Sequence, residues 1–405
     1  MTTPSQPGGA ETECSALNCA VMRLRLAEFR NYSQLDLQLD ARPVCLFGEN
    51  GAGKTNLAEA VSFLGPGRGL RGAGADAIRR RQPGDAPGEA PGEAPVLVNW
   101  AVFAEAMTPD GPVTLATGAD PANPARRKTR LDGAAATQSE LARILPMMWL
   151  TPREDRLWAG ARSDRLRFFD RLVLAGEPGH GAQAAAYEKS MRQRQRLLEG
   201  EAEGRRADPD WLTALEIEMA GAGVALAAAR LDALVRLQGE IDARPASAFP
   251  KADIALEGEV EAWLAESASA AEAEERFART LQDARRRDAA TGRTLSGPHR
   301  TELAARHRDK DQRAADCSTG EQKSLVVGLA LAQAAALARA RDRAPILILD
   351  EACAHLDAAR REGLAEALLA VGGQAWLTGV DRALFTAFGQ SAQFIRVNNA
   401  IAEPA

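Results

Sequence analysis

The sequence predicts an α/β fold in which a nucleotide-binding head is divided by an inserted, mainly helical lobe. Three observations support the prediction. A glycine-rich loop at Gly48–Thr55 lies between a short apolar strand and a helix, and an apolar strand at Ile346–Leu349 ends in two acidic residues. Between them, residues 155–288 consist of long Ala-, Arg- and Glu-rich stretches with helical character. We therefore expect the two strand-rich halves to build one head around the insert.

The bulk composition is that of a soluble globular protein. The chain has 405 residues, of which 45% are hydrophobic and 26% charged, enough for one large domain or two ordinary ones with buried cores. The N-terminus lacks a signal pattern, and no stretch approaches the apolar length needed to span a bilayer. Five cysteines without C-x-x-C spacing indicate reduced, mostly buried thiols. We expect a cytoplasmic protein with no membrane partner.

Changes in composition divide the chain into four segments. Residues 1–20 are small, polar and unpatterned, which predicts a disordered tail. We expect residues 22–154 to form the first half of the head, 155–288 the helical lobe, and 289–405 the second half of the head. A low-complexity loop, GDAPGEAPGEAP at 84–95, interrupts the first half.

The periodicity of apolar residues places the individual elements. Alternation predicts strands, and recurrence every three or four residues predicts helices. No sustained heptad runs through the insert, so we expect a compact helical lobe rather than a long coiled coil. Strand character is expected at 24–26, 35–39, 44–47, 96–104, 112–117, 126–131, 147–150, 252–256, 295–303, 346–349, 375–378 and 393–402. Helices are expected directly after the glycine-rich loop, at 163–174, 182–203, 211–241 and 268–288, from the segment 317–323 to about 341, and between 357 and 375.

The run Gly48-Glu49-Asn50-Gly51-Ala52-Gly53-Lys54-Thr55 fits the phosphate-binding pattern G-x-x-x-x-G-K-[ST]. Its glycines let backbone N–H groups point at phosphate oxygens, and the following helix adds its partial positive charge. Lys54 can reach the β- and γ-phosphates of ATP, and Thr55 can offer its hydroxyl to Mg²⁺. A glycine-rich turn that binds nothing is the alternative, but the strand and helix on its two sides favour the nucleotide site.

The strand that ends in Asp350 and Glu351 suits the second half of such a site. Asp350 would hold Mg²⁺ through its waters, and Glu351 would polarise the water that attacks the γ-phosphate. The alternative is an ordinary buried strand with a solvated acidic end. With a phosphate loop upstream, the nucleotide interpretation is the better one.

The segment Cys317–Lys323 contains Ser-x-Gly-Glu-Gln directly before a long helix. Ser318 followed three residues later by Glu321 is a capping box, which explains both residues structurally. A cap does not require Gly320, and a serine hydroxyl beside a glycine amide at a helix N-terminus can also sense a γ-phosphate. Both interpretations can hold together.

The order of these motifs resembles the ABC-type ATPase head. The phosphate loop is followed by S-x-G-E-Q, by the strand with Asp-Glu, and by A-x-L-D at 354–357. The runs Phe29–Tyr32, Gly48–Asn56 and Gly297–Arg300, with the lack of a coiled coil, are similar to the RecF family of bacterial recombination mediators. The similarity covers about Met22 to Val397. It is specific in the two head segments and loose in the helical lobe.

The resemblance implies an ATP-dependent homodimer that binds DNA at single-stranded regions, gaps or duplex junctions. It further implies recombination mediator proteins as partners, a role in recombinase loading and the SOS response, and a weak, DNA-stimulated ATPase that uses Mg²⁺. The resemblance assigns ATP binding to Gly48, Asn50, Gly51, Gly53, Lys54, Thr55, Ser318, Gly320, Gln322 and Asp357. It assigns metal binding to Thr55 and Asp350, and catalysis to Glu351.

Two positions depart from the patterns of such proteins. Relatives often carry a second aspartate where this chain has Glu351. The switch histidine of transporter ATPases is absent, and Thr378 stands at the end of the expected strand 375–378, where that histidine would be. No residue of this chain is assigned to the glutamine loop of such ATPases. A transporter-type or SMC-like ATPase and a non-catalytic, ATP-gated scaffold are the alternatives. The helical insertion and the Phe-Arg-Asn-Tyr turn argue against the transporter.

The charge distribution limits how DNA could bind. A net charge of −5 excludes a global basic field, so contact has to come from local patches. With 5% aromatic residues there is little sign of a base-stacking platform, so we expect contact with the backbone. A solvated charged face is the alternative for each patch. The candidate patches are Arg68 with Arg71, Arg79–Arg81, Arg126–Arg130 and Arg162–Arg171.

Overall fold

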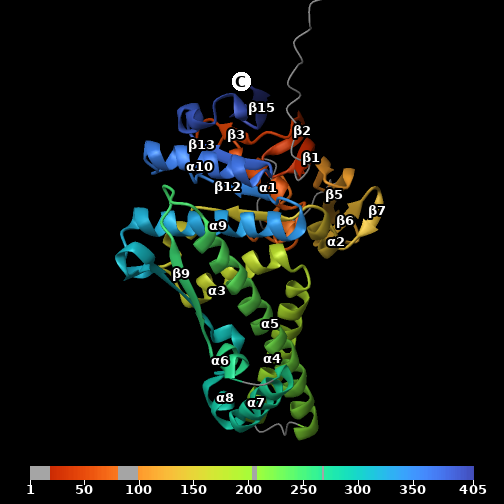
Figure 1. Cartoon of the computed structure of the whole chain (residues 1–405). Coiled ribbons are helices and arrows are strands. Elements are labelled where there is room, and N and C mark those ends of the chain that lie inside the picture. The colour runs from red at the N-terminus through yellow and green to blue at the C-terminus, as the bar shows by residue number, and fades with distance from the viewer. Residues whose placement is uncertain (1–18, 81–98, 203–207, 267–268) are drawn as a thin grey trace, which may run out of the picture.

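The computed structural model describes residues 19–80, 99–202, 208–266 and 269–405, so the predicted loop at 84–95 and all but the last two residues of the tail predicted at 1–20 lie outside them. The described chain forms a rounded head from which an arm of helices extends (Figure 1). The helices are α1 (Lys54–Ser62), α2 (Gln138–Ile144), α3 (Arg162–Gly176), α4 (His180–Ala202), α5 (Pro209–Ala243), α6 (Glu259–Glu266), α7 (Ala270–Asp283), α8 (Arg285–Thr291), α9 (Thr319–Arg341) and α10 (Ala358–Val371).

A mainly parallel sheet joins the two halves of the head. Its strand order is β15-β14-β3-β13-β12-β8, and β3 pairs in parallel with both β13 and β14. The phosphate loop therefore leaves a central strand whose neighbours come from the far end of the chain. The strands are β3 (Val44–Phe47), β8 (Met147–Leu150), β12 (Ile346–Leu349), β13 (Ala375–Gly379), β14 (Gln393–Asn398) and β15 (Ile401–Pro404).

Both faces of this sheet are buried, as its continuous apolar strands require. In β12, Ile346 and Ile348 join the core that contains α1 and the antiparallel sheet. Leu347 and Leu349 point to the opposite face, into the core built by α3, α9 and α10. Two hydrophobic cores thus hold the sheet between them, and the carboxyl ends of its strands meet at one edge beside α1.

An antiparallel sheet covers the α1 side of the head, with strand order β2-β1-β4-β5-β6-β7. Strand β1 begins at Ala20, and Cys19 before it is fully buried, so the tail predicted at 1–20 is wrong at its last two residues, which are folded before the expected Met22. Its backbone is held there because Gln374 donates its N–H to the carbonyl of Cys19. The strands are β1 (Ala20–Phe29), β2 (Tyr32–Gln38), β4 (Ala101–Thr108), β5 (Gly111–Asp120), β6 (Asn123–Leu131) and β7 (Ala134–Ala136).

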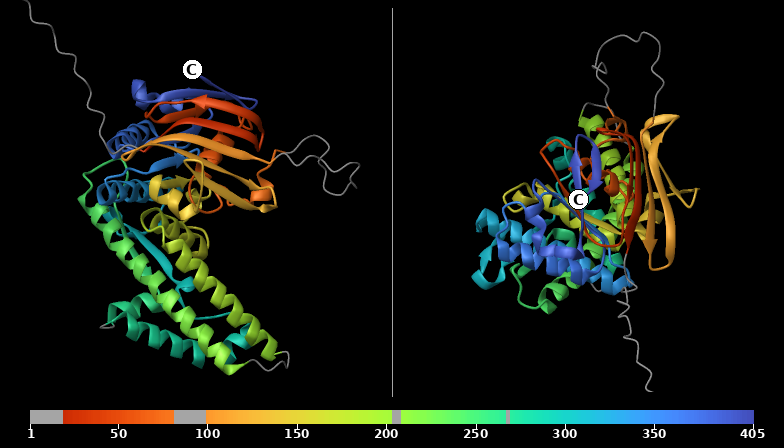
Figure 2. Two further views of the ribbon diagram at one scale, coloured as in Figure 1. Left: turned by 90° about the vertical axis from the view of Figure 1, so that its right-hand side faces the viewer. Right: turned by 90° about the horizontal axis from the view of Figure 1, so that it is seen from above.

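The inserted helices form an arm rather than the compact lobe expected from the sequence. Helices α4 and α5 lie side by side and extend from the head, with α6, α7 and α8 packed near the far end (Figures 1 and 2). The stretch expected as one helix at 268–288 is divided at Ala284 into α7 and α8. Strand β9 (Ala252–Glu257) of the insert pairs with β10 (Glu302–His307), which pairs in turn with β11 (Gln312–Arg313), so the insert and the second half of the head share a small sheet.

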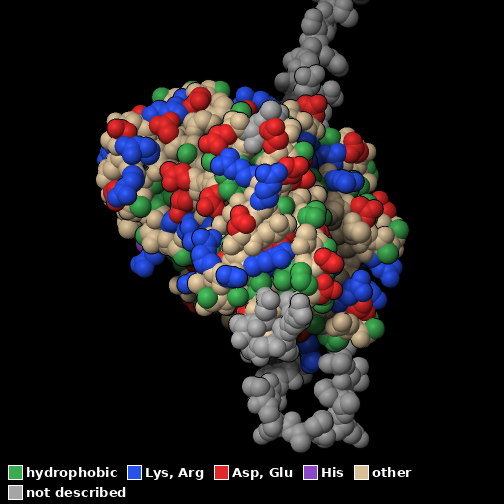
Figure 3. All heavy atoms as spheres, turned by 90° about the horizontal axis from the view of Figure 1, so that it is seen from below, with side chains coloured by type: hydrophobic (Ala, Val, Ile, Leu, Met, Phe, Trp, Pro, Cys, Tyr) green, Lys and Arg blue, Asp and Glu red, His purple; other side chains and the backbone are tan. Residues whose placement is uncertain are grey.

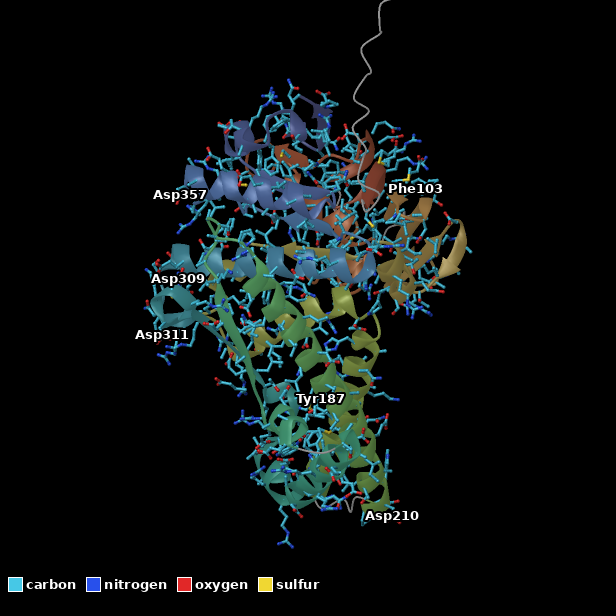
Figure 4. The ribbon with its side chains drawn as sticks, in the orientation of Figure 1. Phe103, Tyr187, Asp210, Asp309, Asp311 and Asp357 are labelled. Atoms are coloured by element: carbon cyan, nitrogen blue, oxygen red, sulfur yellow. The ribbon has the colours of Figure 1, made fainter. Side chains whose placement is uncertain are left out.

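The strand expected at 295–303 is wrong over most of its length. Pro298–Arg300 forms a 3₁₀ turn, and β10 starts only at Glu302. Gly297 before the turn has a φ of 130°, and a Cβ there would lie 2.3 Å from the Tyr187 hydroxyl of α4. A glycine is required by the close approach of the arm, and a proline follows it, so an extended ladder cannot form. Figure 4 marks Tyr187 within the arm.

Two helices, α5 and α9, are long and apolar enough to cross a membrane by length and composition, which corrects the expectation that no stretch approaches that length. Half of the apolar window of α5 and 78% of that of α9 are buried inside the protein. Two such helices are weak evidence for a membrane span, because a mostly buried core helix passes the same test.

Candidate functional site

Two glycines of the phosphate loop are fixed by what surrounds them. Gly48 has a φ of 149°, and a Cβ at this position would lie 2.1 Å from the carbonyl oxygen of Val397 in β14. Gly53 has a φ of 117°, and its Cβ would lie 2.6 Å from the Tyr32 hydroxyl. Any residue other than glycine would clash at both positions through its Cβ and would also strain the backbone. The loop is therefore shaped by close contact with β14 on one side and with the β1–β2 turn on the other.

Lys54 begins α1 with its side chain folded over the loop. Its Nζ donates hydrogen bonds to the carbonyls of Gly48 (2.8 Å) and Glu49 (2.7 Å), and the residue is 6% exposed. Burial lowers the pKa of the ammonium, whereas the charges of Glu351 and Asp350 act in the opposite direction. The predicted phosphate ligand and the two predicted carboxylates thus lie close enough to interact electrostatically.

One hydrogen-bond chain connects the first half of the head to the second. Thr55 Oγ1 donates to Asp350 Oδ1 (2.9 Å), although 295 residues separate them. Thr378 Oγ1 donates to the same oxygen (2.7 Å) and accepts the backbone N–H of Glu351 (2.9 Å). Glu351 has a φ of 56°, an uncommon conformation for a glutamate, and its side chain is exposed. Thr378, at the end of β13, therefore positions both acidic residues.

The oxygen atoms gathered here fit Mg²⁺. A hydroxyl and a carboxylate, from Thr55 and Asp350, are the hard ligands that this ion prefers alongside water and phosphate oxygens. Within the described residues there is no group of three or more His, Cys, Asp or Glu side chains that could hold a metal without such partners. The donor set thus suits an ion that arrives with a nucleotide.

The β1–β2 turn braces the phosphate loop, a role that its sequence did not reveal. Arg30 donates two hydrogen bonds to Glu59 of α1 (2.8 and 2.7 Å), and the Glu59 side chain is fully buried. Asn31 accepts from Asn56 (2.7 Å), and the Tyr32 hydroxyl donates to the carbonyl of Gly53 (3.1 Å). The turn Phe29–Tyr32 stood out in the sequence only as a family resemblance, because its partners lie more than twenty residues away.

The last hairpin of the chain also touches the loop. The N–H of Ala400, in the β14–β15 turn, donates to the carbonyl of Ala52 (3.0 Å). A cleft of about 280 Å³ opens between the start of the phosphate loop and β14. Its walls are Phe47–Glu49, Val380–Arg382 and Arg396–Asn398. The loop therefore has open space on the side of β14.

The Ser-x-Gly-Glu-Gln segment forms the capping box of α9. Ser318 Oγ accepts the N–H of Glu321 (3.4 Å), and Glu321 Oε2 accepts the N–H of Ser318 (3.0 Å). Lys310 and Ser318 bond the Glu321 carboxylate and lower its pKa to about 2. Ser318, Thr319 and Gly320 are exposed. In the described part of the chain, Ser318 and Gly320 hydrogen-bond within their own helix and make no hydrogen bond to the phosphate loop.

Asp357 lies near the Ser-x-Gly-Glu-Gln segment. It caps α10 by accepting the N–H of Arg360 (2.8 Å), and the Arg360 guanidinium approaches Gly320, where an added Cβ would be 3.9 Å away. Figure 4 shows Asp357 on the same side of the head as Asp309 and Asp311, which precede the Ser-x-Gly-Glu-Gln segment. Gln322 is buried and donates to the carbonyls of Ala315 and Cys317, so its amide supports the cap. Asn50 and Gly51 are exposed in the phosphate loop.

The candidate site thus has two parts. The phosphate loop, Asp350, Glu351 and Thr378 form one cluster. Ser318, Gly320 and Asp357 form a second, exposed surface, called here the signature surface. Lys323 connects the two, because its Nζ donates to the carbonyls of Glu351 (3.4 Å) and Ala354 (3.1 Å).

Comparison with known proteins agrees with this architecture. Residues 20–401 match the family described as RecF/RecN/SMC N terminal domain. The DNA replication and repair protein RecF of Caulobacter sp. (strain K31) is 49% identical over 94% of this chain and 96% of that protein, and RecF of Rhizobium meliloti (strain 1021) is 46% identical over 93% and 96%.

Solved structures share the fold at low sequence identity. The recombination mediator protein RecF-ATPrS in the RecFOR pathway superposes with a TM-score of 0.79 at 17% identity, covering 97% of this chain and 100% of that one. RecF-ATP in the same pathway gives 0.76 at 16% identity over 96% and 100%. The head is an ABC-type ATPase head, and the chain belongs to the RecF family.

Proposed function

We propose that this protein is an ATP-controlled, DNA-binding protein of recombinational repair and replication-fork maintenance. The observation that carries the proposal is the hydrogen bond between Thr55 and Asp350, which joins the phosphate loop to the strand with Asp-Glu in one site. Relatives of the same family, at up to 49% identity, are named DNA replication and repair proteins. A cytoplasmic location and the absence of a membrane partner follow from this role.

Each residue of the loop cluster has a role in binding or hydrolysing ATP. The backbone N–H groups of Gly48–Gly53 and the Lys54 ammonium would bind the phosphates, because the loop opens toward them at the N-terminus of α1. Thr55 and Asp350 would hold Mg²⁺, which neutralises charge on the phosphates when bound. Glu351 would accept the proton of the attacking water, since its exposed carboxylate follows the metal-binding residue.

Dimerisation completes the site in this proposal. Ser318 and Gly320 are exposed at the N-terminus of α9, where backbone N–H groups and the helix dipole favour an anion. Since they make no hydrogen bond to the loop of their own chain in the described residues, we propose that they cap the γ-phosphate bound by a second copy. ATP would then close two heads around DNA at gaps or junctions, where recombination mediator proteins promote recombinase loading.

Two variants separate the loop from the signature surface. Lys54→Ala should abolish Mg-ATP binding in a folded protein, because the phosphates lose their cationic partner. Ser318→Arg should leave ATP binding by the monomer nearly unchanged and prevent ATP-dependent dimerisation, because the arginine obstructs the exposed cap. Equilibrium ATP binding and solution mass, each with and without ATP, measure both effects. Equal loss of monomer ATP binding in the two variants would contradict the two-copy site.

A further inference from the structure

A groove of about 730 Å³ lies between the loop that follows α1 and strand β6, at the edge of the head where Figure 1 labels β6 and β7. One wall is formed by Gly67, Arg68 and Ala73–Ala75 and the other by Ala125–Arg130, and Ala135–Gln138 also line the groove. Small residues such as Gly67, Gly74 and Ala75 make up much of the first wall. A polymer backbone can therefore approach the protein closely here.

The charged residues that line this groove are all basic. Arg68 comes from the first wall, and Arg126, Arg127, Lys128 and Arg130 come from the second, while the lining contains no Asp or Glu. In a chain with a net charge of −5 this is a marked local excess. Two other large grooves of the described chain, beside α5 and beside β10, each carry carboxylates as well as arginines. Basic and acidic side chains are likewise interspersed on the face seen in Figure 3.

Other basic patches predicted from the sequence are largely engaged within the protein. Arg71 pairs with Glu59 (3.3 Å), and Arg165 pairs with Glu302 (2.6 Å). Arg171 pairs with Glu154 (2.6 Å). Their charges are neutralised by partners that help to hold the fold, so they contribute little to an anion-binding surface.

The basic side chains of the groove are less engaged in ion pairs than those of the other patches. In the described part of the chain, neither Arg68 nor Arg126 lies within ion-pair distance of a carboxylate, and Arg130 donates only to the carbonyl of Gly133. Lys128 pairs with Asp120 (2.9 Å) but is 59% exposed. Arg126, Lys128 and Arg130 alternate along β6 at intervals of about 6.6 Å, so they share the face of the strand opposite Arg127 and border the groove from that outer face. A line of cations fits a repeating polyanion better than a single phosphate.

The same strand is tied to the nucleotide site. Arg127 points the opposite way from its neighbours and donates to the carbonyls of Phe63 (3.2 Å) and Gly65 (2.9 Å). Phe63 caps the C-terminus of α1, the helix that begins with Lys54. A movement of α1 on binding a nucleotide would therefore reach β6 through one buried guanidinium.

We propose that this groove binds the phosphodiester backbone of DNA, through Arg68, Arg126 and Arg130, next to the C-terminal end of the phosphate-loop helix. The inference rests on the proposed DNA-binding function and adds the surface that carries it. Contact is with phosphates rather than bases, so binding is insensitive to sequence and falls steeply with salt.

The test compares two triple variants with the same change in charge. The groove variant carries Arg68→Gln, Arg126→Gln and Arg130→Gln. The control carries Arg192→Gln, Arg276→Gln and Arg279→Gln on the arm, whose side chains are 61%, 52% and 73% exposed. Binding of a labelled gapped duplex in the presence of Mg-ATP is measured by fluorescence anisotropy over a range of salt concentrations. Thermal unfolding and ATP affinity confirm that each variant folds.

Each phosphate contact contributes about 0.9 to the slope of log affinity against log salt. The groove variant should therefore lose about 3 from this slope and about a hundredfold in affinity at 0.1 M salt. The control, and a groove variant with lysine at the three positions, should keep the wild-type slope. A wild-type slope in the glutamine groove variant, or an equal loss in the control, would overturn the inference. If the wild-type protein with ATP binds no DNA, the proposed function itself fails.

Discussion

Thr378→Val replaces a hydroxyl with a methyl group of similar size and tests how the carboxylates of Asp350 and Glu351, the proposed metal ligand and base, are positioned. Thr378 is 1% exposed, and its hydroxyl donates to Asp350 (2.7 Å) while it accepts the N–H of Glu351 (2.9 Å). Valine fills the same space but makes neither bond. The change therefore isolates the hydrogen bonds from the packing of β13.

The cost follows from these two bonds. A hydrogen bond to a carboxylate contributes about 1.5–3 kcal/mol, and an unpaired N–H costs about 1–3 kcal/mol where water cannot replace the partner. Because Asp350 keeps Thr55 and the Glu351 segment can reach solvent, we expect a loss of about 2–4 kcal/mol in the free energy of unfolding. We also expect ATP hydrolysis to slow by about 10- to 100-fold, equivalent to about 1.4–2.8 kcal/mol, as Glu351 loses its restraint at a φ of 56°.

Urea denaturation measures the first quantity, and single-turnover hydrolysis with saturating Mg-ATP measures the second. ATP affinity should change little, because Lys54 and the loop are untouched. Thr378→Ser keeps the hydroxyl and should restore hydrolysis to near the wild-type rate. The positioning role of Thr378 is refuted if the valine variant hydrolyses ATP at the wild-type rate, or if the serine variant is as slow as the valine variant.

Three further outcomes are expected from the same geometry. Glu351→Gln should keep Mg-ATP binding but slow turnover, so that ATP-bound dimers accumulate in size-exclusion chromatography; unchanged turnover would exclude Glu351 as the base. Arg30→Met leaves the fully buried Glu59 with one weaker partner and should lower the unfolding free energy by about 2–4 kcal/mol in urea, with an unchanged m-value; a loss below about 1 kcal/mol would contradict the bracing role. Glu321 has a pKa of about 2 in the folded protein against an ordinary 4.5, so its cap should stabilise α9 fully above pH 4.5 and lose effect as the pH falls toward 2. The stability difference between wild type and Glu321→Gln, measured between pH 7 and 2.5, should be constant down to about 5 and then shrink.

Local patterns predicted much of this molecule. The phosphate loop, the capping box at Ser318 and the apolar strands of the parallel sheet are each encoded within ten residues, and the structure contains all of them. The contact between Thr55 and Asp350 was also predictable, because carboxyl ends of parallel strands meet at one edge of a sheet. The catalytic and ATP-binding roles stay predictions.

Features that depend on distant partners were not predictable. The buried pair Arg30–Glu59 and the bridge made by Thr378 involve residues whose own neighbours carry no signal for either contact. The strand expected at 295–303 was wrong because the backbone at Gly297 is set by its close contact with Tyr187 of the arm, which the local sequence pattern does not reveal. The extended shape of the inserted helical lobe was not predictable for a similar reason, since the length of α5 does not say whether it folds back on the head or leaves it.

The pairing of β3 with β13 and β14 has a consequence for how the protein is made. Phe47 and Ala375 stand about 330 residues apart, so the ribosome, at roughly 5–20 residues per second, needs about 20–70 s to supply the first neighbour of the phosphate-loop strand. Helices α4 and α5 are close in sequence and can pair long before that. During synthesis the arm should therefore form while the head is still incomplete, and nascent chains that stop before β14 should not bind ATP. The ability to bind a nucleotide would appear only when almost the whole chain has been translated.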